Sequence, residues 1–410
     1  MTERKAILLI MDGLSDRPVS DLGDKTPLEY AQTPAMDAAA ARGVCGLMDP
    51  IAPGCVAGSD TAHLALLGLN PYEIYSGRGP FEAAGIDMEV QPGDVAFRVN
   101  FSTVDDDLRV VDRRAGRITE GTHELAQALN GLEIDGVKCY FKESVAHRAA
   151  LVLRGEGLGA NVSDVDPHEV GAKIWEAKGA DEASQRTAEV VNKFVRKSHE
   201  ILREHPVNKK RQAEGKLPAN IALPRGAGLA PHIGQSFDER FGLKSACIVE
   251  TGLIRGIGVY LKMDIIDVEG ATGGLDSDVM ATAKAVVQAL DDHNFVLCNI
   301  KGPDVAGHDQ DAMAKVQMIE RIDQAVRYIT DNVPSDTYLV LTADHSTPIE
   351  VGDHSGDPVP LVIDGPGVRV DEVTQFNERA VTAGGLLRVR GTDLMLMLTN
   401  LMGVQHKFGA

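Results

Sequence analysis

Four short and largely apolar runs recur along the chain, and each is followed by polar or turn-forming residues. They are "AILLIM" (6–11), "FVLCNI" (295–300), "TYLVLTA" (337–343) and "VPLVID" (359–364). Runs of this kind are typical of strands buried on both faces of a parallel sheet. Residues 278–290 and 312–329 instead repeat apolar positions every three or four residues, which predicts amphipathic helices. The pattern therefore predicts an α/β fold, with a mainly parallel sheet and helices on both faces.

The middle of the chain has a different pattern. "DVAFRVNFSTV" (94–104) and "HRAALVLRG" (147–155) alternate more and predict strands, and 181–205 predicts a long amphipathic helix. The polar stretch "HPVNKKRQAEGKLPAN" (205–220) predicts an exposed loop, and "NIALPRGAG" after it a further strand. We therefore expect a smaller α+β domain at 91–230, inserted into a catalytic domain made of 1–90 and 231–410.

Composition narrows the class of protein. The chain has 410 residues, 43% of them hydrophobic and 25% charged, as in ordinary globular proteins. Its net charge of −19 argues against nucleic acid and anionic membranes as partners. The apolar run near residue 10 is short and is followed directly by Asp12, so we expect no signal peptide, and no run approaches the roughly 18 apolar residues of a membrane span. Five scattered cysteines without a CxxC motif predict free thiols and a cytoplasmic location. The oligomeric state is not predicted.

Acidic and histidine side chains follow the predicted strands. They are Asp12 after the first, Asp304 and His308 in "KGPDVAGHD", Asp344 and His345 in "DHSTP", and His354 in "GDHSGDPVP". Taken singly, each suits a turn, a cap or a solvated pair. Ligands of open α/β sheets bind beyond the carboxyl ends of the strands, so together these residues predict a metal site. Asp and His without Cys indicate a catalytic site, and six ligands suit two ions better than one.

Ser59 lies in "PGCVAGSDTAHLALLG", directly before a helical pattern. A serine at this place is typically the helix N-cap. The alternative is a nucleophile, which needs a base or a metal to activate its hydroxyl. No G-x-S-x-G elbow is present, whereas a metal site is predicted nearby. We therefore expect Ser59 to be the nucleophile, at a helix start that favours an incoming phosphate.

These motifs resemble the alkaline phosphatase superfamily of two-metal enzymes. Over nearly the whole chain, the sequence is similar to archaeal-type 2,3-bisphosphoglycerate-independent phosphoglycerate mutases. The strings that carry the narrower resemblance are "GSDTAHLALLGLNP", "GRGPFEAAG", "FRVNFSTVD", "DRRAGR", "DPH", "RGAG" and "GATGGLDSD".

The resemblance implies a reaction and a set of roles. Asp304, His308 and His354 would hold one divalent ion (Mn, Mg, Co or Zn), and Asp12, Asp344 and His345 the other, with Ser59 as a further ligand. Ser59 would carry the phosphoryl group between the two hydroxyls of glycerate in glycolysis and gluconeogenesis, without added 2,3-bisphosphoglycerate. The inserted domain would close over the sheet and exclude water. Candidates for binding the substrate anions are Arg78, Arg98, Arg114, Arg117, His147, Arg148, Arg225, Arg255 and Lys301.

Two alternatives stay open. A metal-dependent phosphatase, a phosphopentomutase or another phosphomutase would use the same ligands, because the inserted domain chooses the acceptor. An inactive binding protein would be expected to lack Ser59 or a ligand, and none is missing.

Overall fold

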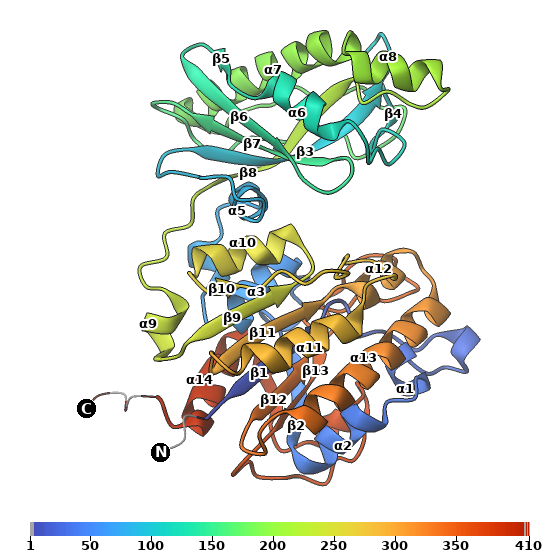
Figure 1. Cartoon of the computed structure of the whole chain (residues 1–410), viewed down its shortest axis with the longest axis vertical. Helices are drawn as coiled ribbons and strands as arrows, with labels where there is room; N and C mark the ends of the chain where they lie inside the picture. Colours follow the sequence, from blue (N-terminus) through green and yellow to red (C-terminus); the bar gives the residue numbers. More distant parts are fainter. Residues whose placement is uncertain (1–3, 406, 408, 410) are drawn as a thin grey trace. The chain divides into compact units, whose positions relative to one another are not determined.

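The computed structural model describes residues 4–405, 407 and 409 of the chain. They form two units: unit 1 is Met1–Ile74 with Ile233–Ala410, and unit 2 is Tyr75–His232 (Figure 1). Unit 2 begins at Tyr75, before α5 (Gly79–Ala84), whereas the inserted domain was expected to begin at residue 91. It begins earlier because α5 packs on the strands of unit 2.

Unit 1 contains an eight-stranded sheet in the order β10-β9-β11-β1-β12-β13-β2-β14. Its central part, from β10 to β12, is parallel, as is the β2–β14 pair. Strand β13 runs antiparallel to both its neighbours. The predicted mainly parallel sheet is therefore confirmed. The strands are β1 (Ala6–Met11), β2 (Val44–Asp49), β9 (Ser245–Val249), β10 (Asp264–Ile265), β11 (Phe295–Ile300), β12 (Tyr338–Thr342), β13 (Val359–Asp364) and β14 (Leu387–Arg390).

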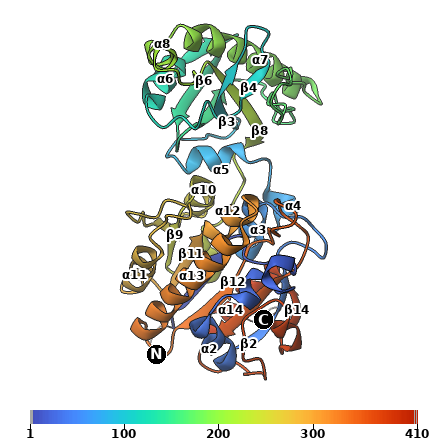
Figure 2. The ribbon, with the colours of Figure 1, turned by 90° about the vertical axis from the view of Figure 1, so that its right-hand side faces the viewer.

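Helices cover both faces of this sheet (Figures 1 and 2). One layer holds α1 (Pro27–Tyr30), α2 (Pro34–Arg42), α11 (Val279–Ala289), α12 (Gly302–His308) and α13 (Ala312–Asn332), joined through contacts to α13. The other holds α3 (Ser59–Leu66), α10 (Gly252–Tyr260) and α14 (Gly391–Met402), joined through α3. Two short helices, α4 (Pro71–Ile74) and α9 (Phe237–Phe241), complete the unit. Strands β1 and β11 are buried throughout, as their apolar sequences predict.

Unit 2 is built on an antiparallel sheet in the order β4-β3-β7-β6-β5, with β8 also paired to β3. The pairs β3–β7 and β3–β8 are both antiparallel, so β3 lies between β7 and β8. The strands are β3 (Val95–Val104), β4 (Val110–Asp112), β5 (Leu132–Ile134), β6 (Val137–Glu143), β7 (Arg148–Arg154) and β8 (Ile221–Leu229).

The two faces of this sheet carry different residues. Helices α6 (Thr122–Leu129) and α7 (Glu182–Arg203) pack on one face over a large apolar core that includes Phe97, Phe101 and Phe194. Helix α5 packs on the other face over a small cluster around Ala83 and Val152. Side chains at every second position of a strand point to the same face, so Arg98 and Asn100 of β3 share the α5 face with Ala96 of this small cluster.

The prediction of an exposed loop at 205–220 was wrong in part, because this segment contains α8 (Pro206–Ala213). The His205 side chain accepts a hydrogen bond from the Val207 amide, and Pro206 occupies the first turn, where no N–H is needed. Asn208 is buried and donates to the carbonyls of Leu202 and Ala219, which fixes the helix to its flanks. Tertiary hydrogen bonds thus order a segment whose composition is typical of a loop.

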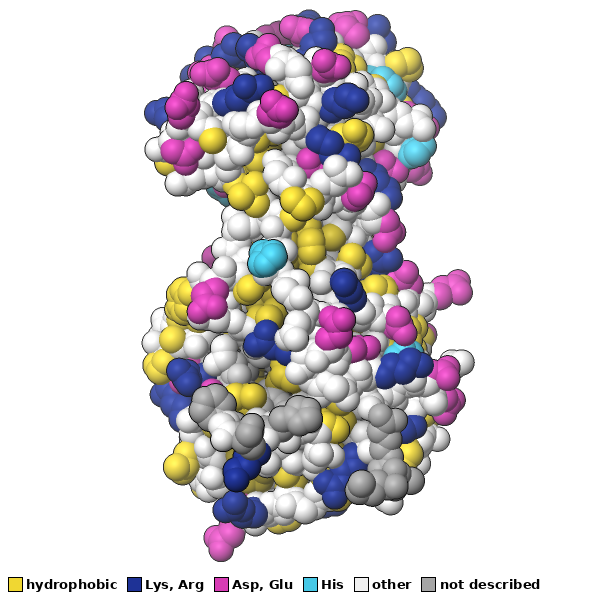
Figure 3. Space-filling model, turned by 90° about the vertical axis from the view of Figure 1, so that its left-hand side faces the viewer, with side chains coloured by type: hydrophobic (Ala, Val, Ile, Leu, Met, Phe, Trp, Pro, Cys, Tyr) yellow, Lys and Arg dark blue, Asp and Glu magenta, His cyan; other side chains and the backbone are white. Residues whose placement is uncertain are grey.

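On the face drawn in Figure 3, acidic and basic side chains of unit 2 are interspersed. Within the described part of the chain, no helix combines the length and the apolar character that a membrane crossing requires.

Candidate active site

The first group of predicted ligands comes together at the carboxyl end of β11. Asp304 and His308 lie one turn apart on α12, which begins directly after this strand, and His354 reaches them from a loop. Their ligand atoms all lie within 4.8 Å of one another. Asp304 is buried, whereas the His308 side chain is 40% exposed. The loop and the helix therefore form an open-sided carboxylate–imidazole cluster.

The second group consists of Asp12, Asp344 and His345, whose ligand atoms also lie within 4.8 Å of one another. Asp12 follows β1 and the other two follow β12, the neighbouring parallel strand, so all three reach the same sheet edge. All three side chains are buried. The Gly13 amide donates to Asp344 Oδ1 at 3.1 Å, and the His345 amide donates to the same oxygen at 3.0 Å.

The chemistry of these groups fits divalent metal ions. His308 Nδ1 donates to the Gly352 carbonyl at 3.0 Å and His354 Nδ1 to the Ala57 carbonyl at 2.8 Å. A backbone carbonyl only accepts, so each ring keeps its Nε2 lone pair free for a metal. Asp344 Oδ2 is buried and has no hydrogen-bond partner. An orphaned carboxylate oxygen beside imidazole nitrogens is the environment that a bound cation would satisfy.

Lys301, a predicted substrate-binding residue, lies between the two ligand clusters. Its Nζ is 2.7 Å from Asp12 Oδ1 and 2.7 Å from Asp304 Oδ2, so it joins the two clusters. Its binding to substrate stays a prediction. Burial by itself lowers the pKa of Lys301, but Asp12 and Asp304 outweigh it, and the net pKa is raised. The side chain is therefore a fixed ammonium charge at the centre of the acidic groups.

Ser59 is the first residue of α3, and Gly58 occupies the N-cap position. The alternative of Ser59 as the N-cap is therefore wrong, because the serine lies inside the first turn and Gly58 has no side chain to cap the helix. The Ser59 hydroxyl lies 3.1 Å from His345 Nε2 and 3.5 Å from Lys301 Nζ. Burial lowers the pKa of His345 to about 3, so the ring that faces Ser59 is neutral. The nucleophile candidate thus contacts one predicted ligand and the lysine that joins both clusters.

A second polar group lies on the α5 face of unit 2. Arg98 is paired with Arg225 across β3 and β8, and Arg148 is opposite Asn100 across β3 and β7. Residues at alternate positions along a strand share a face, which brings these guanidinium groups to one side of the sheet. Arg78, immediately before α5, adds a further cation.

Glu82 on α5 is the acidic partner of this group. Its Oε1 accepts from Arg78 Nε at 2.8 Å and lies 3.7 Å from Arg98 Nε. Burial alone would raise the pKa of Glu82, but Arg78, Arg98 and Arg148 hold the net pKa below its ordinary value. Arg98 Nε and His147 Nδ1 are buried without hydrogen-bond partners. Burial and the surrounding arginines lower the pKa of His147 to about 4. The group therefore has unsatisfied donor capacity that suits an anion.

The remaining predicted cations are distributed differently. The charge of Arg114 contributes to lowering the pKa of His147 and of Arg148. Arg117 is exposed, and Arg255 on α10 pairs with Asp267 at 3.3 Å. Substrate binding by these three residues, as by the other predicted cations, stays a prediction.

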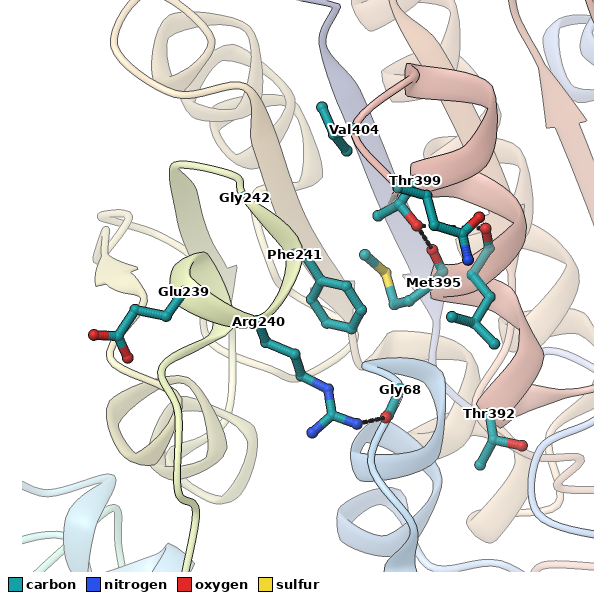
Figure 4. A pocket seen from close by; sticks show the side chains of 11 residues that line it. Gly68, Glu239, Arg240, Phe241, Gly242, Thr392, Met395, Thr399 and Val404 are labelled. Atoms are coloured by element: carbon teal, nitrogen blue, oxygen red, sulfur yellow. Dashed lines mark hydrogen bonds between the residues drawn. The ribbon is translucent and has the colours of Figure 1, made fainter. Parts of the chain in front are cut away.

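A cavity of about 380 Å³ lies elsewhere in unit 1, between α9 and α14 (Figure 4). Two of its polar side chains are bonded within the protein: Arg240 donates to the Gly68 carbonyl at 3.0 Å and Thr399 to the Met395 carbonyl at 2.6 Å. None of its lining residues belongs to either ligand cluster. We therefore place the candidate site at the ligand clusters, not in this cavity.

Comparison with known sequences decides the family. The profile described as 2,3-bisphosphoglycerate-independent phosphoglycerate mutase matches residues 40–208. A mutase of that name from Methanothermobacter thermautotrophicus is 54% identical, with 99% of this chain and 100% of the relative aligned. Another from Methanocaldococcus jannaschii is 51% identical over the full length of both chains. The chain belongs to the 2,3-bisphosphoglycerate-independent phosphoglycerate mutase family.

Solved structures agree with this membership of the mutase family. A Pyrococcus horikoshii protein is 40% identical with a TM-score of 0.88, and both chains are covered completely. A cofactor-independent phosphoglycerate mutase from Thermoplasma acidophilum is 38% identical with a TM-score of 0.69, covering 98% of this chain and 100% of that one. The predicted resemblance to this family is therefore confirmed.

Sequence reasoning missed two polar residues of this mutase family member: Glu82 within the arginine group of unit 2, and Asn299 beside the ligand clusters of unit 1. Glu82 carries no sequence signal, because its partners come from separate strands. Asn299 does: it is the only polar residue in "FVLCNI", and its Nδ2 donates to Asp12 Oδ2 at 3.1 Å. A polar residue in an otherwise apolar buried strand is the signal that could have found it.

Proposed function

We propose that this chain interconverts 3-phosphoglycerate and 2-phosphoglycerate through a phosphoserine at Ser59, without added 2,3-bisphosphoglycerate. The observation that carries the proposal is the position of the Ser59 hydroxyl. It contacts His345 of one ligand cluster and Lys301, which is ion-paired to both clusters.

The five cysteines are all unpaired, in keeping with the cytoplasmic location that we also propose.

Two divalent ions are part of this proposal. Asp304, His308 and His354 would hold one ion, and Asp12, Asp344 and His345 the other, with Ser59 as a further ligand. When bound, such ions supply Lewis-acid charge that favours ionisation of the serine hydroxyl and offsets the charge of the phosphoryl group. Carboxylate and imidazole ligands suit Mn, Co and Zn, and carboxylates also suit Mg.

The proposed reaction is a double transfer. Ser59 Oγ forms a bond to phosphorus while the bond from phosphorus to the glycerate oxygen breaks, and the serine proton ends on glycerate. The other glycerate hydroxyl then attacks phosphorus, the serine–phosphorus bond breaks, and Ser59 recovers a proton. Lys301 keeps its positive charge and stabilises the negative charge on the transferring group. Atoms and charge balance over the cycle, so no co-substrate is required.

The arginine group of unit 2 would bind the anionic ends of the substrate. Phosphoglycerate carries a carboxylate and a phosphate, and guanidinium groups bind both through paired hydrogen bonds. Arg98 Nε has no hydrogen-bond partner, and the acidic partners described for these four arginines are fewer than the arginines: Glu82 for Arg78 and Arg98, and Asp166 for Arg225. Both observations support this role. Closure of the inserted domain stays a prediction.

The test uses the full chain with Mn²⁺ and 3-phosphoglycerate and no added 2,3-bisphosphoglycerate, followed by phosphorus NMR. We expect 2-phosphoglycerate to form and the activity to disappear after metal chelation. Free phosphate without 2-phosphoglycerate would refute the mutase proposal in favour of a phosphatase. Rapid quenching with ³²P-labelled substrate should trap label on the wild type and on Ser20→Ala, an exposed-serine control, but not on Ser59→Ala.

A further inference from the structure

A buried chain of hydrogen bonds links the backbone of Ser59 to Asp12. His63 lies on α3, one turn after Ser59, and its Nδ1 is 2.7 Å from the Ser59 carbonyl oxygen. Its Nε2 is 3.2 Å from Asn299 Nδ2, and the same amide nitrogen is 3.1 Å from Asp12 Oδ2. His63 and Asn299 are both 0% exposed. These hydrogen bonds thus join α3 to the end of β1 through the core of unit 1.

The hydrogen-bond partners determine which nitrogen atoms of His63 and Asn299 carry the protons. A backbone carbonyl only accepts, so His63 Nδ1 carries the proton and donates to Ser59. His63 Nε2 is then an acceptor, and it faces an amide nitrogen that only donates. The second hydrogen of that nitrogen points to the Asp12 carboxylate, which only accepts. Rotating the Asn299 amide by half a turn would place its oxygen against two acceptors, so one orientation is selected.

Stability alone does not account for this arrangement. Asn299 lies in β11, with Ile10 of β1 on one side and Val249 of β9 on the other. Its Oδ1 is buried and has no hydrogen-bond partner. A buried acceptor without a partner destabilises a protein, whereas an apolar residue in a central strand carries no such cost. The asparagine therefore lowers stability at a strand position from which its side chain reaches the Asp12 carboxylate.

The arrangement also restricts Asp12. Asn299 holds Oδ2, so Oδ1 is the oxygen that faces Lys301, at 2.7 Å. At the other end, His63 Nδ1 holds the carbonyl of the residue whose hydroxyl is the proposed nucleophile, and the same nitrogen lies 3.5 Å from Asp344 Oδ2. Partners that orient metal ligands in this way tune metal affinity and activity in other sites.

We propose that His63 and Asn299 are positioning residues that fix Asp12 and the Ser59 backbone relative to each other. The inference rests on the proposed phosphoryl transfer by Ser59. It assigns separate effects to the two ends of the chain. The Asn299 end controls how Asp12 is presented to a cation, and the His63 end controls where the serine stands.

A matched pair of substitutions separates the two ends. The amide of His63→Gln can take the place of Nε2 toward Asn299 but not that of Nδ1 toward Ser59. The amide of His63→Asn can take the place of Nδ1 but not that of Nε2. We expect His63→Gln to lower kcat about 10- to 100-fold and to raise the Mn²⁺ dissociation constant less than Asn299→Ala does, because the lost Nδ1 lies 3.5 Å from Asp344 Oδ2. We expect His63→Asn and Asn299→Ala to raise the Mn²⁺ dissociation constant by a similar factor.

The readouts are the Mn²⁺ dissociation constant of the full chain by calorimetry without substrate, kcat and KM, and the melting temperature without metal. Thr399→Val is the control, because Thr399 is buried and bonds a backbone carbonyl in α14. It should lower the melting temperature and leave both constants unchanged. If the His63 and Asn299 variants behave like this control, the positioning role is refuted. If His63 variants do not fold, the Asn299→Ala dissociation constant decides. Absence of mutase activity in the wild type would instead refute the proposed function.

Discussion

Glu378 should make the stability of unit 1 depend on pH. Its carboxyl group accepts from the Asp16 amide at 3.0 Å and from Thr26 Oγ1 at 2.7 Å. Burial removes water from the carboxylate and raises the pKa of Glu378 to about 7, although both hydrogen bonds and Lys315 act in the opposite direction. Asp16 in turn accepts from the buried Lys315 at 2.7 Å, and Lys315 donates to the Thr347 carbonyl at 3.0 Å. The network thus lies behind the loops that carry Asp12 and Asp344–His345.

The size and sign of the effect follow from this pKa. The folded state holds the proton of Glu378 more tightly than the unfolded state, whose pKa is near the ordinary 4.5. The free energy of unfolding therefore falls as pH rises from about 4.5 to about 7, and it is constant above that range with respect to this group. At about 1.4 kcal/mol per pH unit, the loss is about 3 kcal/mol.

Glu378→Gln tests this directly. The glutamine carbonyl can accept from the Asp16 amide while its NH₂ group donates to Thr26, so both contacts survive without a charge. We expect the variant to exceed the wild type by about 3 kcal/mol at pH 8.5 and to match it near pH 4.5. The only tryptophan, Trp175, lies in unit 2. Fluorescence would therefore report the wrong unit, and hydrogen exchange of β1 and β12 amides in urea is the suitable measurement.

The control for this experiment is Glu372→Gln, which removes an exposed carboxylate six positions earlier. It should leave the exchange of these amides unchanged at both pH values. The reasoning is refuted if Glu378→Gln differs from the wild type by the same amount at pH 4.5 and pH 8.5, or if it is less stable at the higher pH.

Two further predictions concern packing and thiol reactivity. A Cβ on Gly79 would lie 2.0 Å from the Ala96 carbonyl oxygen, so Gly79→Ala should destabilise unit 2 by about 1–3 kcal/mol, measured by Trp175 fluorescence in urea. Gly234→Ala, which meets open space, should have no effect on either unit, and equal behaviour of the two variants would contradict the clash. At pH 8, native protein should release about one equivalent of thionitrobenzoate from DTNB, from the half-buried Cys55, and five after denaturation. Burial raises the pKa of the other four thiols, so rapid release of several equivalents would refute this expectation; they are Cys45, Cys139, Cys247 and Cys298.

The sequence predicted the central strands of unit 1 because strands that are buried on both faces have continuous apolar sequences. Strands β1, β11 and β12 are apolar along most of their length, and their neighbours in the sheet explain why. The same pattern in β13 predicted a buried strand but not its direction, which is antiparallel to β12. Burial determines composition, whereas direction depends on the path of the connection. For the same reason, the two-residue edge strand β10 has too few residues to show any pattern.

The metal-ligand candidates and the arginine group differ in how far sequence can predict them. Asp12, Asp304 and Asp344 each follow a strand, and parallel strands deliver their carboxyl ends to one edge whatever the details of pairing. The arginines need more than strand order. Arg98 reaches Arg225 only because β3 and β8 pair in one register, and a shift of one residue would turn one of these side chains to the apolar face. Composition and spacing do not contain that register, so the grouping around Glu82 had to come from the structure. The hydrogen-bonded chain through Asn299 lies between these cases. Asn299 can be noticed in the sequence as a polar residue within an apolar strand, but its partner His63 on α3 cannot be predicted from it.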